Sequence, residues 1–292
     1  MGKVYFLGKR MLPVMPQWLK RVILFCGCWL GVVAAAADYL GGDRLPRSSQ
    51  ALAGVRRIPY TLVETRKADV HAFTQGLYLL EDTLYLGTGL YGKSELRAID
   101  WNTGAVLQRK ALPRNVFGEG VTVVGDRIYQ LTWKNGLLNI YDRDDFELIE
   151  TVAYQGEGWG LTHNATHLIM SNGTAQLTFR ALDSFAVSHA LKVTANGSPI
   201  NHLNELEWVN GWILANRWFT HQIVWISPET GAVGGVLDLS PIVAEVRKRQ
   251  PRADVLNGIA YDVANDLLII TGKLWDRYYL LKVDWESAEP SL

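Results

Sequence analysis

Short apolar stretches separated by polar turns recur along most of this 292-residue chain. In the first such unit, apolar or alternating stretches occupy residues 77–80, 84–87, 96–100 and 105–107. Alternation with a period of two, broken by turn residues, predicts consecutive β-strands joined by hairpins. The same order of elements returns in four further units, so the pattern predicts an all-β fold.

A short motif opens each unit and defines the repeat. It occurs at residues 73–77, 118–121, 158–161, 203–206 and 256–259. The positions that align are Gly76, Gly120, Gly160, Glu205 and Gly258, which lie 44, 40, 45 and 53 residues apart in succession. Repeats of this length with four strands each are typical of β-propeller blades. We therefore predict a five-bladed β-propeller built from four-stranded antiparallel blades.

The fifth unit ends one strand short, at residues 279–283. An alternating stretch at residues 60–65, ahead of the first unit, is expected to supply the missing outer strand of the last blade. Such closure hides sheet edges and ties the two ends of the domain together. An insertion at residues 240–255 interrupts the repeat, and its apolar spacing after Pro241 predicts a short amphipathic helix.

Up-and-down connectivity places two sets of loops at the same end of a propeller. Loops that enter the first strand carry the motifs, whose variable residues are Gln75, Glu119, Trp159, Asn204 and Asn257. Loops that join the second strand to the third carry Tyr91, Trp133, Asn172, Arg217, Trp218 and Lys273. Both sets should meet at one mouth of the central channel. Aromatic walls with a few converging polar groups are typical of a small-ligand pocket.

The first 37 residues are expected to be a targeting segment rather than part of the fold. Five basic residues precede the apolar run from Val22 to Val33, and four alanines at residues 34–37 follow it. The run is shorter than the roughly 20 apolar residues that span a bilayer. We predict a signal peptide at 1–37, or a signal anchor if it is not cleaved, a linker at 38–57 and the propeller domain at 58–292. The domain should then be periplasmic or secreted.

Charge and cysteine usage narrow the possible functions. The chain has 29 basic and 29 acidic residues, so loss of the five basic residues in the first 37 leaves a net charge of about −5. No basic surplus remains to bind nucleic acid. Both cysteines, Cys26 and Cys28, lie in the targeting segment, so the exported domain should have neither a disulfide nor a thiolate. We expect a monomer that contacts a membrane only if its N-terminal segment is retained.

Nine stretches of the chain resemble the plant and bacterial type of glutaminyl-peptide cyclotransferase, also called glutamine cyclotransferase. They are Phe73–Leu77, Thr88–Gly92, Phe117–Gly120, Leu131–Trp133, Gly158–Leu161, Leu203–Glu207, Ala215–Asn216, Leu256–Ala260 and Thr271–Trp275. They occur in register from about Phe73 to Val283, which covers nearly the whole expected domain. The resemblance departs at Asn172, where the family usually has aspartate, and at Arg217, where an apolar residue is more common.

This resemblance implies a five-bladed propeller that converts the N-terminal glutamine of peptides and proteins to pyroglutamate and releases ammonia. It implies no cofactor and no metal, in contrast to the unrelated zinc-dependent animal enzymes. Glu119 takes the place of the family's acid/base. The pocket positions implied by the resemblance are Phe73, Gln75, Trp133, Trp159, Asn204, Trp218 and Lys273.

The chemistry of cyclisation suits these residues. The α-amine must lose a proton and the leaving ammonia must gain one, and a single carboxyl group can do both in turn. We hypothesise that Glu119 is this proton shuttle, with its pKa raised by desolvation among tryptophans. Lys273 or Asn204 would then polarise the side-chain amide oxygen as negative charge develops on it.

Other interpretations remain open at this stage. The domain could be a non-catalytic propeller that binds a small ligand or peptide, or a metal-dependent propeller hydrolase, although one carboxylate among five motifs is few for a metal. Glu119 could be a solvated loop carboxylate, Lys273 could extend along the rim, and Gln75 and Asn204 could only tie blades together. His163 and His167 flank a turn at the opposite end, where a metal site is not expected. Three further tryptophans are expected to serve packing: Trp208, Trp212 and Trp225.

Overall fold

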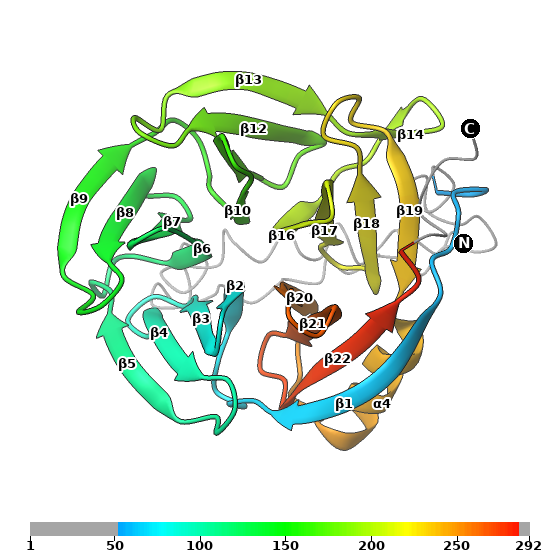
Figure 1. The fold of residues 1–292 in the computed structure, drawn as a ribbon, viewed down its shortest axis with the longest axis horizontal. Helices are drawn as coiled ribbons and strands as arrows, with labels where there is room; N and C mark the ends of the chain where they lie inside the picture. The colour runs from blue at the N-terminus through cyan, green and yellow to red at the C-terminus, as the bar shows by residue number, and fades with distance from the viewer. Residues whose placement is uncertain (1–51, 286–292) are drawn as a thin grey trace, which may run out of the picture. The chain divides into compact units, whose positions relative to one another are not determined.

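Five four-stranded antiparallel sheets surround a central axis as the blades of a propeller in the computed structural model, which describes residues 52–285 (Figure 1). Blade 1 consists of β2 (Thr74–Leu80), β3 (Thr83–Thr88), β4 (Glu95–Asp100) and β5 (Val106–Ala111), and blade 2 of β6 (Gly118–Val124), β7 (Arg127–Thr132), β8 (Leu137–Asp142) and β9 (Leu148–Ala153). Blade 3 consists of β10 (Leu161–His163), β11 (His167–Met170), β12 (Gln176–Ala181) and β13 (Val187–Lys192). Blade 4 consists of β16 (Leu203–Val209), β17 (Trp212–Arg217), β18 (Gln222–Ile226) and β19 (Val233–Asp238).

The last blade combines the two ends of the described chain, as the sequence predicts. It consists of β20 (Leu256–Asp262), β21 (Leu267–Gly272), β22 (Arg277–Val283) and β1 (Tyr60–Lys67). Strand β1 pairs antiparallel with β22, from Tyr60 opposite Val283 to Lys67 opposite Arg277. Between blades 3 and 4 the chain forms a small hairpin of β14 (Thr194–Ala195) and β15 (Ser198–Pro199). The predicted fold, blade count and closure are confirmed.

The end of the expected linker is part of the folded domain. The Ile58 N–H donates to the Val236 carbonyl and the Val236 N–H to the Arg56 carbonyl, both at 2.9 Å, so this segment lies along β19. Leu52 is buried in the core of blade 4. The predicted targeting segment, and the linker before residue 52, lie outside the described residues.

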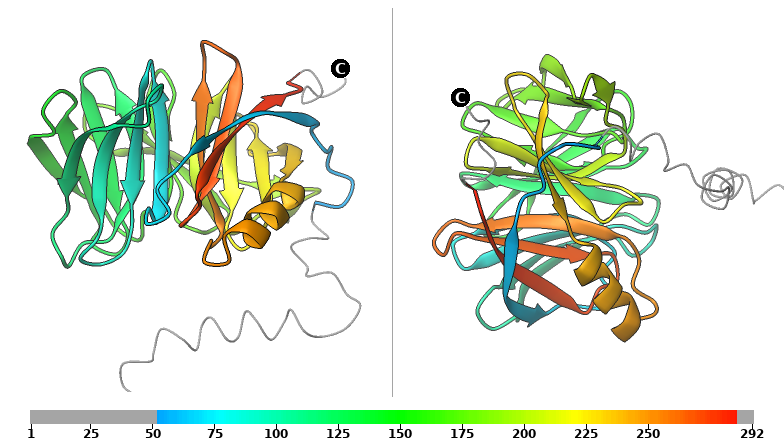
Figure 2. Two further views of the ribbon diagram at one scale, coloured as in Figure 1. Left: turned by 90° about the horizontal axis from the view of Figure 1, so that it is seen from below. Right: turned by 90° about the vertical axis from the view of Figure 1, so that its right-hand side faces the viewer.

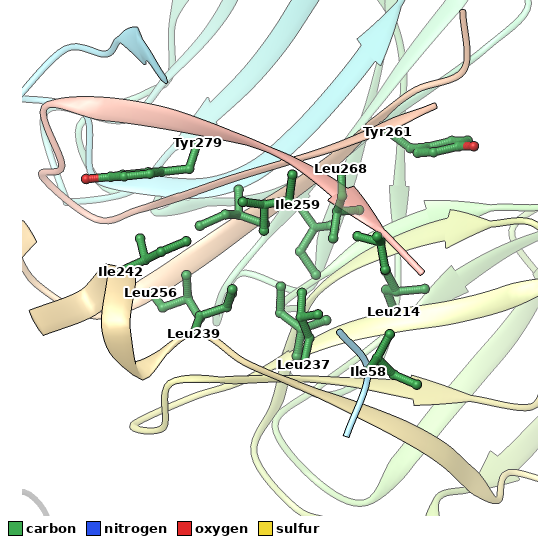
Figure 3. Packing of buried hydrophobic residues seen from close by; sticks show 14 of the residues in the cluster. Ile58, Leu214, Leu237, Leu239, Ile242, Leu256, Ile259, Tyr261, Leu268 and Tyr279 are labelled. Atoms are coloured by element: carbon green, nitrogen blue, oxygen red, sulfur yellow. The ribbon is translucent and has the colours of Figure 1, made fainter. Parts of the chain in front are cut away.

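The predicted helix is α4 (Ser240–Arg249), which lies beside blades 4 and 5 (Figure 2). It begins with Pro241 in its first turn and buries Ile242, Val243 and Val246. Ile242 packs among aliphatic side chains of both neighbouring blades, including Leu256 (Figure 3). The helix has ten residues, and no helix within residues 52–285 is long and apolar enough to cross a membrane.

The repeated motifs form the narrow inner edge of the ring. Strand pairing shifts register inside four of them, at Thr74/Gly76, Gly118/Val121, Leu203/Leu206 and Leu256/Ile259. Such β-bulges re-aim side chains and bend the strand. A Cβ atom at Gly76 would overlap the Val121 nitrogen of blade 2, and one at Gly160 would overlap the Asn204 carbonyl of blade 4. The motif glycines therefore allow neighbouring blades to meet backbone to backbone.

Candidate active site

The two sets of loops expected at one mouth are joined by backbone hydrogen bonds. Trp133 N–H donates to the Phe117 carbonyl at 3.0 Å, and Trp218 N–H donates to the His202 carbonyl at 2.8 Å. Trp133, Trp218 and Lys273 each directly follow the second strand of their blade. The symmetry of the fold thus brings residues from all five blades to one end of the channel.

Glu119 lies at the bottom of this mouth and is buried, with 4% of its surface exposed. Its Oε1 accepts a hydrogen bond from Gln75 Nε2 at 3.1 Å. The side-chain amide of Asn257 donates to the Thr74 carbonyl at 3.0 Å and to Gln75 Oε1 at 3.4 Å, which orients the Gln75 amide. Gln75 therefore ties blades together and also presents a donor to the carboxyl group, so the interpretation of Glu119 as a solvated loop residue is wrong.

Lys273 shares this buried environment, with only 5% of its surface exposed. Burial raises the pKa of Glu119 well above its usual range, although the positive charge of Lys273 opposes the rise. Burial also lowers the pKa of Lys273, and the carboxylates of Glu119 and Asp254 oppose that change. The ammonium lies 4.8 Å from the ring centroid of Phe73. Burial thus favours the protonated carboxyl group of Glu119 and the neutral amine of Lys273. Because Lys273 is buried, it does not extend along the rim.

Two tryptophan side chains at this mouth share a hydrogen-bond acceptor, a carboxylate that the sequence did not single out. Trp133 Nε1 and Trp159 Nε1 both donate to Glu157 Oε2, at 2.7 and 3.0 Å. Lys134 Nζ lies 4.0 Å from the other oxygen of this carboxylate. Glu157 lies just outside the aligned motif, two residues before Trp159, so the repeat carried no signal for it.

Ring contacts connect the remaining aromatic side chains around the mouth. Trp159 and Trp218 meet edge to face with centroids 5.2 Å apart. Phe117, which sequence analysis also missed, lies 5.4 Å from Trp133 and 6.3 Å from Phe73. Phe73, Trp133, Trp159 and Trp218 are all half-buried, so each ring has one part in the protein and another facing solvent.

Asn204 is buried beside the motif of blade 3, where its carbonyl accepts a hydrogen bond from Ser171 Oγ at 2.7 Å. Its side-chain Oδ1 has no hydrogen-bond partner within residues 52–285. A buried polar atom without a partner is rare, because leaving it unpaired costs free energy. Asn204 thus contributes a buried acceptor that is unpaired within the described residues.

The two departures from the family pattern have local structural roles. Asn172 Oδ1 accepts from Thr174 Oγ1 at 2.6 Å and from its N–H at 3.2 Å, an arrangement that an aspartate oxygen would also provide. Arg217 is buried and donates from Nη1 to Gln222 Oε1 at 2.8 Å. These hydrogen bonds lie outside the set that joins Glu119, Gln75 and Asn257.

The remaining candidates lie where the sequence indicated. Burial lowers the pKa of His163 to about 4, and its Nδ1 lies 2.9 Å from Thr122 Oγ1. Within residues 52–285, no three of His, Cys, Asp and Glu side chains cluster as metal ligands would. Trp225 is fully buried, and Trp208 and Trp212 pack against the hydrophobic clusters, as predicted.

The structure is a five-bladed propeller in which a buried acid, a buried lysine and three half-buried tryptophans lie on the loops of one mouth. The family model described as glutamine cyclotransferase matches residues 34–283, and the chain belongs to this enzyme family. The glutaminyl-peptide cyclotransferase of Arabidopsis thaliana is 38% identical over 224 residues, which are 76% of this chain and 70% of that protein. The crystal structure of Myxococcus xanthus glutaminyl cyclase superposes with a TM-score of 0.73 at 35% identity, covering 79% of this chain and 98% of that one.

Proposed function

We propose that this pocket cyclises the N-terminal glutamine of peptides and proteins to pyroglutamate and releases ammonia, with Glu119 as the proton shuttle. The proposal is carried by the buried Glu119 carboxyl group, which contacts Gln75 and is electrostatically coupled to Lys273. The names of the Arabidopsis and Myxococcus relatives support the same reaction.

The reaction forms a bond between the α-nitrogen and the side-chain amide carbon, and breaks the bond from that carbon to the amide nitrogen. The free α-amine has a pKa of ~7.7–8.0, so a usable neutral fraction exists at mild pH. Holding the glutamine in a ring-like pose removes rotational freedom before the reaction. The amine's proton passes to the carboxylate of Glu119, which then returns it to the leaving ammonia. Because burial raises the pKa of Glu119, proton uptake and return are closer in free energy than for an exposed carboxylate.

Two neighbouring groups would stabilise the intermediate. The ammonium form of Lys273 would donate a hydrogen bond to the amide oxygen as negative charge develops there. The unpaired Oδ1 of Asn204 would accept a hydrogen bond from a substrate N–H and so help to orient the glutamine. A tryptophan wall of Trp133, Trp159 and Trp218 would exclude water from this site. These steps need no metal ion, and we propose that the reaction is metal-independent.

The decisive experiment measures ammonia release from a glutaminyl dipeptide by the purified protein, with and without a chelator. We expect Glu119→Gln to lower kcat by about 10²–10⁴-fold, because the proton shuttle is lost while the side chain keeps its shape. Glu150→Gln, on the exposed strand β9, is the matched control and should keep full activity. Circular dichroism and binding of the pyroglutamyl product should be unchanged in both variants.

Each contrary result has a defined meaning. Normal turnover by Glu119→Gln would remove Glu119 as the shuttle but leave the reaction standing. Loss of activity with a chelator would contradict metal independence. A wild-type protein that binds the dipeptide without releasing ammonia would support the non-catalytic binding module instead.

We also propose, from the sequence alone, that the domain is exported and monomeric. The basic residues and apolar run of the first 37 residues support export. Cell fractionation with mass measurement of the mature chain would test it, since a cytoplasmic protein of full length would contradict export. Light scattering would test the monomer.

A further inference from the structure

The tryptophan wall continues outwards from the pocket onto a solvent-exposed ring. Trp159 meets Trp218 edge to face, and Phe219 then stacks on Trp218 with ring centroids 3.9 Å apart and planes inclined by 28°. Phe219 is 54% exposed, so its face away from Trp218 is open to solvent. A continuous aromatic path therefore leads from the pocket to the outer rim of blade 4.

The backbone holds Phe219 in this position at a conformational cost. The Thr220 N–H donates to the Arg217 carbonyl at 3.0 Å and closes a turn in which Phe219 has φ 62°. This left-handed conformation at the third position of a turn normally selects glycine or asparagine. The corresponding places in blades 1, 3 and 5 are held by Leu90, Gly173 and Leu274, which also have positive φ, at 85°, 80° and 61°. The left-handed conformation is therefore a feature of the repeat, and what distinguishes Phe219 from Leu90 and Leu274 is that its ring is exposed whereas they are half-buried.

We propose that Phe219 forms a subsite for the side chain of the residue that follows the N-terminal glutamine, and that this subsite favours apolar and aromatic side chains. The inference rests on the proposed function, because it takes the glutamine to lie against Trp159 and Trp218. The rest of the peptide must then leave through the mouth, where Phe219 extends the same wall. An apolar side chain laid on the open ring removes apolar surface from water, and an aromatic one adds a ring contact.

Tyr91 provides an internal comparison. It is the other aromatic side chain in the described part of the chain that is more than half exposed, at 52%, and it follows the second strand of blade 1. Its ring meets Phe117 at 73° with centroids 5.4 Å apart, so it stands on edge rather than lying flat. It therefore extends no flat surface from the Trp159–Trp218 pair.

The test compares kcat/KM for glutaminyl-phenylalanine, glutaminyl-leucine and glutaminyl-glycine amides in the wild type, Phe219→Gly and Tyr91→Ala. Glycine accepts the φ of position 219 without strain, so the first variant should fold at least as well as the wild type. We expect the ratio of kcat/KM for the phenylalanine substrate to that for the glycine substrate to fall about five- to tenfold in Phe219→Gly, mainly through KM. The ratio should stay the same in Tyr91→Ala.

The outcomes separate the subsite from the reaction on which it depends. A wild type without preference for an apolar second residue, or an unchanged ratio in Phe219→Gly, would overturn the subsite while cyclisation stands. A ratio that falls in Tyr91→Ala and not in Phe219→Gly would also overturn it, because the contact would then lie on blade 1. No ammonia from any of the three substrates would overturn the proposed function itself, and the subsite with it.

Discussion

The indole N–H groups of Trp133 and Trp159 converge on one oxygen of Glu157, at 2.7 and 3.0 Å. The two tryptophans come from different blades, so this carboxylate sets the distance between two parts of the pocket wall. It also raises the pKa of Glu119 through charge repulsion. Glu157 is therefore a positioning residue with an electrostatic effect on the proposed proton shuttle.

Two substitutions separate these effects. Glu157→Ala removes the shared acceptor, so we expect kcat/KM to fall about 10–100-fold as the indoles lose their orientation. Glu157→Gln keeps an acceptor oxygen but removes the charge, so most activity should remain. The pKa of Glu119 should then fall, and the limb of the pH–rate profile that reports it should move to lower pH.

The measurement is the pH dependence of kcat/KM together with tryptophan fluorescence, with Glu150→Ala on exposed β9 as the control. Equal losses in both Glu157 variants without movement of the pH limb would show a merely structural residue.

Single site residues were predictable only where the alignment of the repeated motifs singled them out. Glu119, Gln75 and Asn204 are the variable positions of an aligned motif, so the sequence could place them at one mouth. Glu157 gains its role from two loops meeting in space, and Phe219 from stacking on Trp218 while its other face stays exposed. Neither property is visible in a linear pattern.

At the scale of elements, the motif glycines do more than relax the backbone. A Cβ atom at Gly160 would overlap the carbonyl oxygen and carbon of Asn204 in the next blade. The overlap is with backbone atoms, which cannot move aside as a flexible side chain would. The first strand of blade 3 and the motif of blade 4 are therefore fixed together at this point.

We expect Gly160→Ala to lower the free energy of unfolding by about 1–3 kcal/mol, because the added methyl group overpacks the blade interface. Gly104→Ala is the comparison, since its φ of 74° is strained for alanine but its Cβ would meet no atom within 4 Å. It should cost about 1–2 kcal/mol through backbone strain alone, so Gly160→Ala is expected to lie at the upper end of its range. Denaturant unfolding measures both, and equal losses would show that backbone strain rather than overlap decides.

Strands and the helix were predictable because their signals are local. Alternation, turn residues and Pro241 located all four strands of blades 1 and 2, the middle strands of blades 3 and 4, and α4. Residues 52–57, the end of the expected linker, have no periodicity, yet Leu52 is buried in the hydrophobic cluster of blades 3 and 4. Ile58, which follows the linker, is buried in the cluster of blades 4 and 5. The hydrogen bonds of this segment go to the edge of β19, a partner almost 180 residues away in the sequence.

At the scale of the whole molecule, two carboxylates on β16 reach across the channel to other blades. Glu205 accepts from the Leu77 N–H of blade 1 at 3.2 Å and from the Ile259 N–H of blade 5 at 2.7 Å. Glu207 accepts from the Tyr261 N–H at 3.2 Å. Desolvation raises the pKa of both groups well above the usual value, as it does for Glu119.

The sign of the pH dependence follows from these raised values. Above the unfolded pKa of about 4.5, the unfolded chain releases these protons while the folded protein retains them, so stability falls as pH rises. Burial lowers the pKa of His163 from 6.5 to about 4, so this histidine makes stability rise with pH between those two values. Above pH 6.5 this opposing effect on stability is absent. We therefore expect the melting temperature to fall as pH rises above 6.5, against an opposing contribution from the lowered pKa of buried Lys273.

Glu207→Gln should flatten this dependence, because an amide can still accept from Tyr261 N–H while Thr162 Oγ1 faces its NH₂ group. Glu205→Gln is the contrasting variant, because the NH₂ group of the glutamine must face the N–H of either Leu77 or Ile259 and cannot accept its hydrogen bond. It should destabilise the protein by about 1–3 kcal/mol. Calorimetry across the pH range measures both effects, and a melting temperature that rises with pH in the wild type would contradict the assignment.

The blade count was accessible from sequence because five units share one motif, and the missing strand of the fifth unit indicated its replacement by β1. The pairing of β1 with β22 also bears on the order in which the blades can form. Synthesis makes β1 first among the strands and its partner β22 last, with Tyr60 finally pairing opposite Val283. Every other blade can assemble from consecutive residues, whereas this one has to wait for the far end of the polypeptide. We therefore expect ring closure to be a late step of folding, and a chain that ends before β22 would leave β1 without its partner strand.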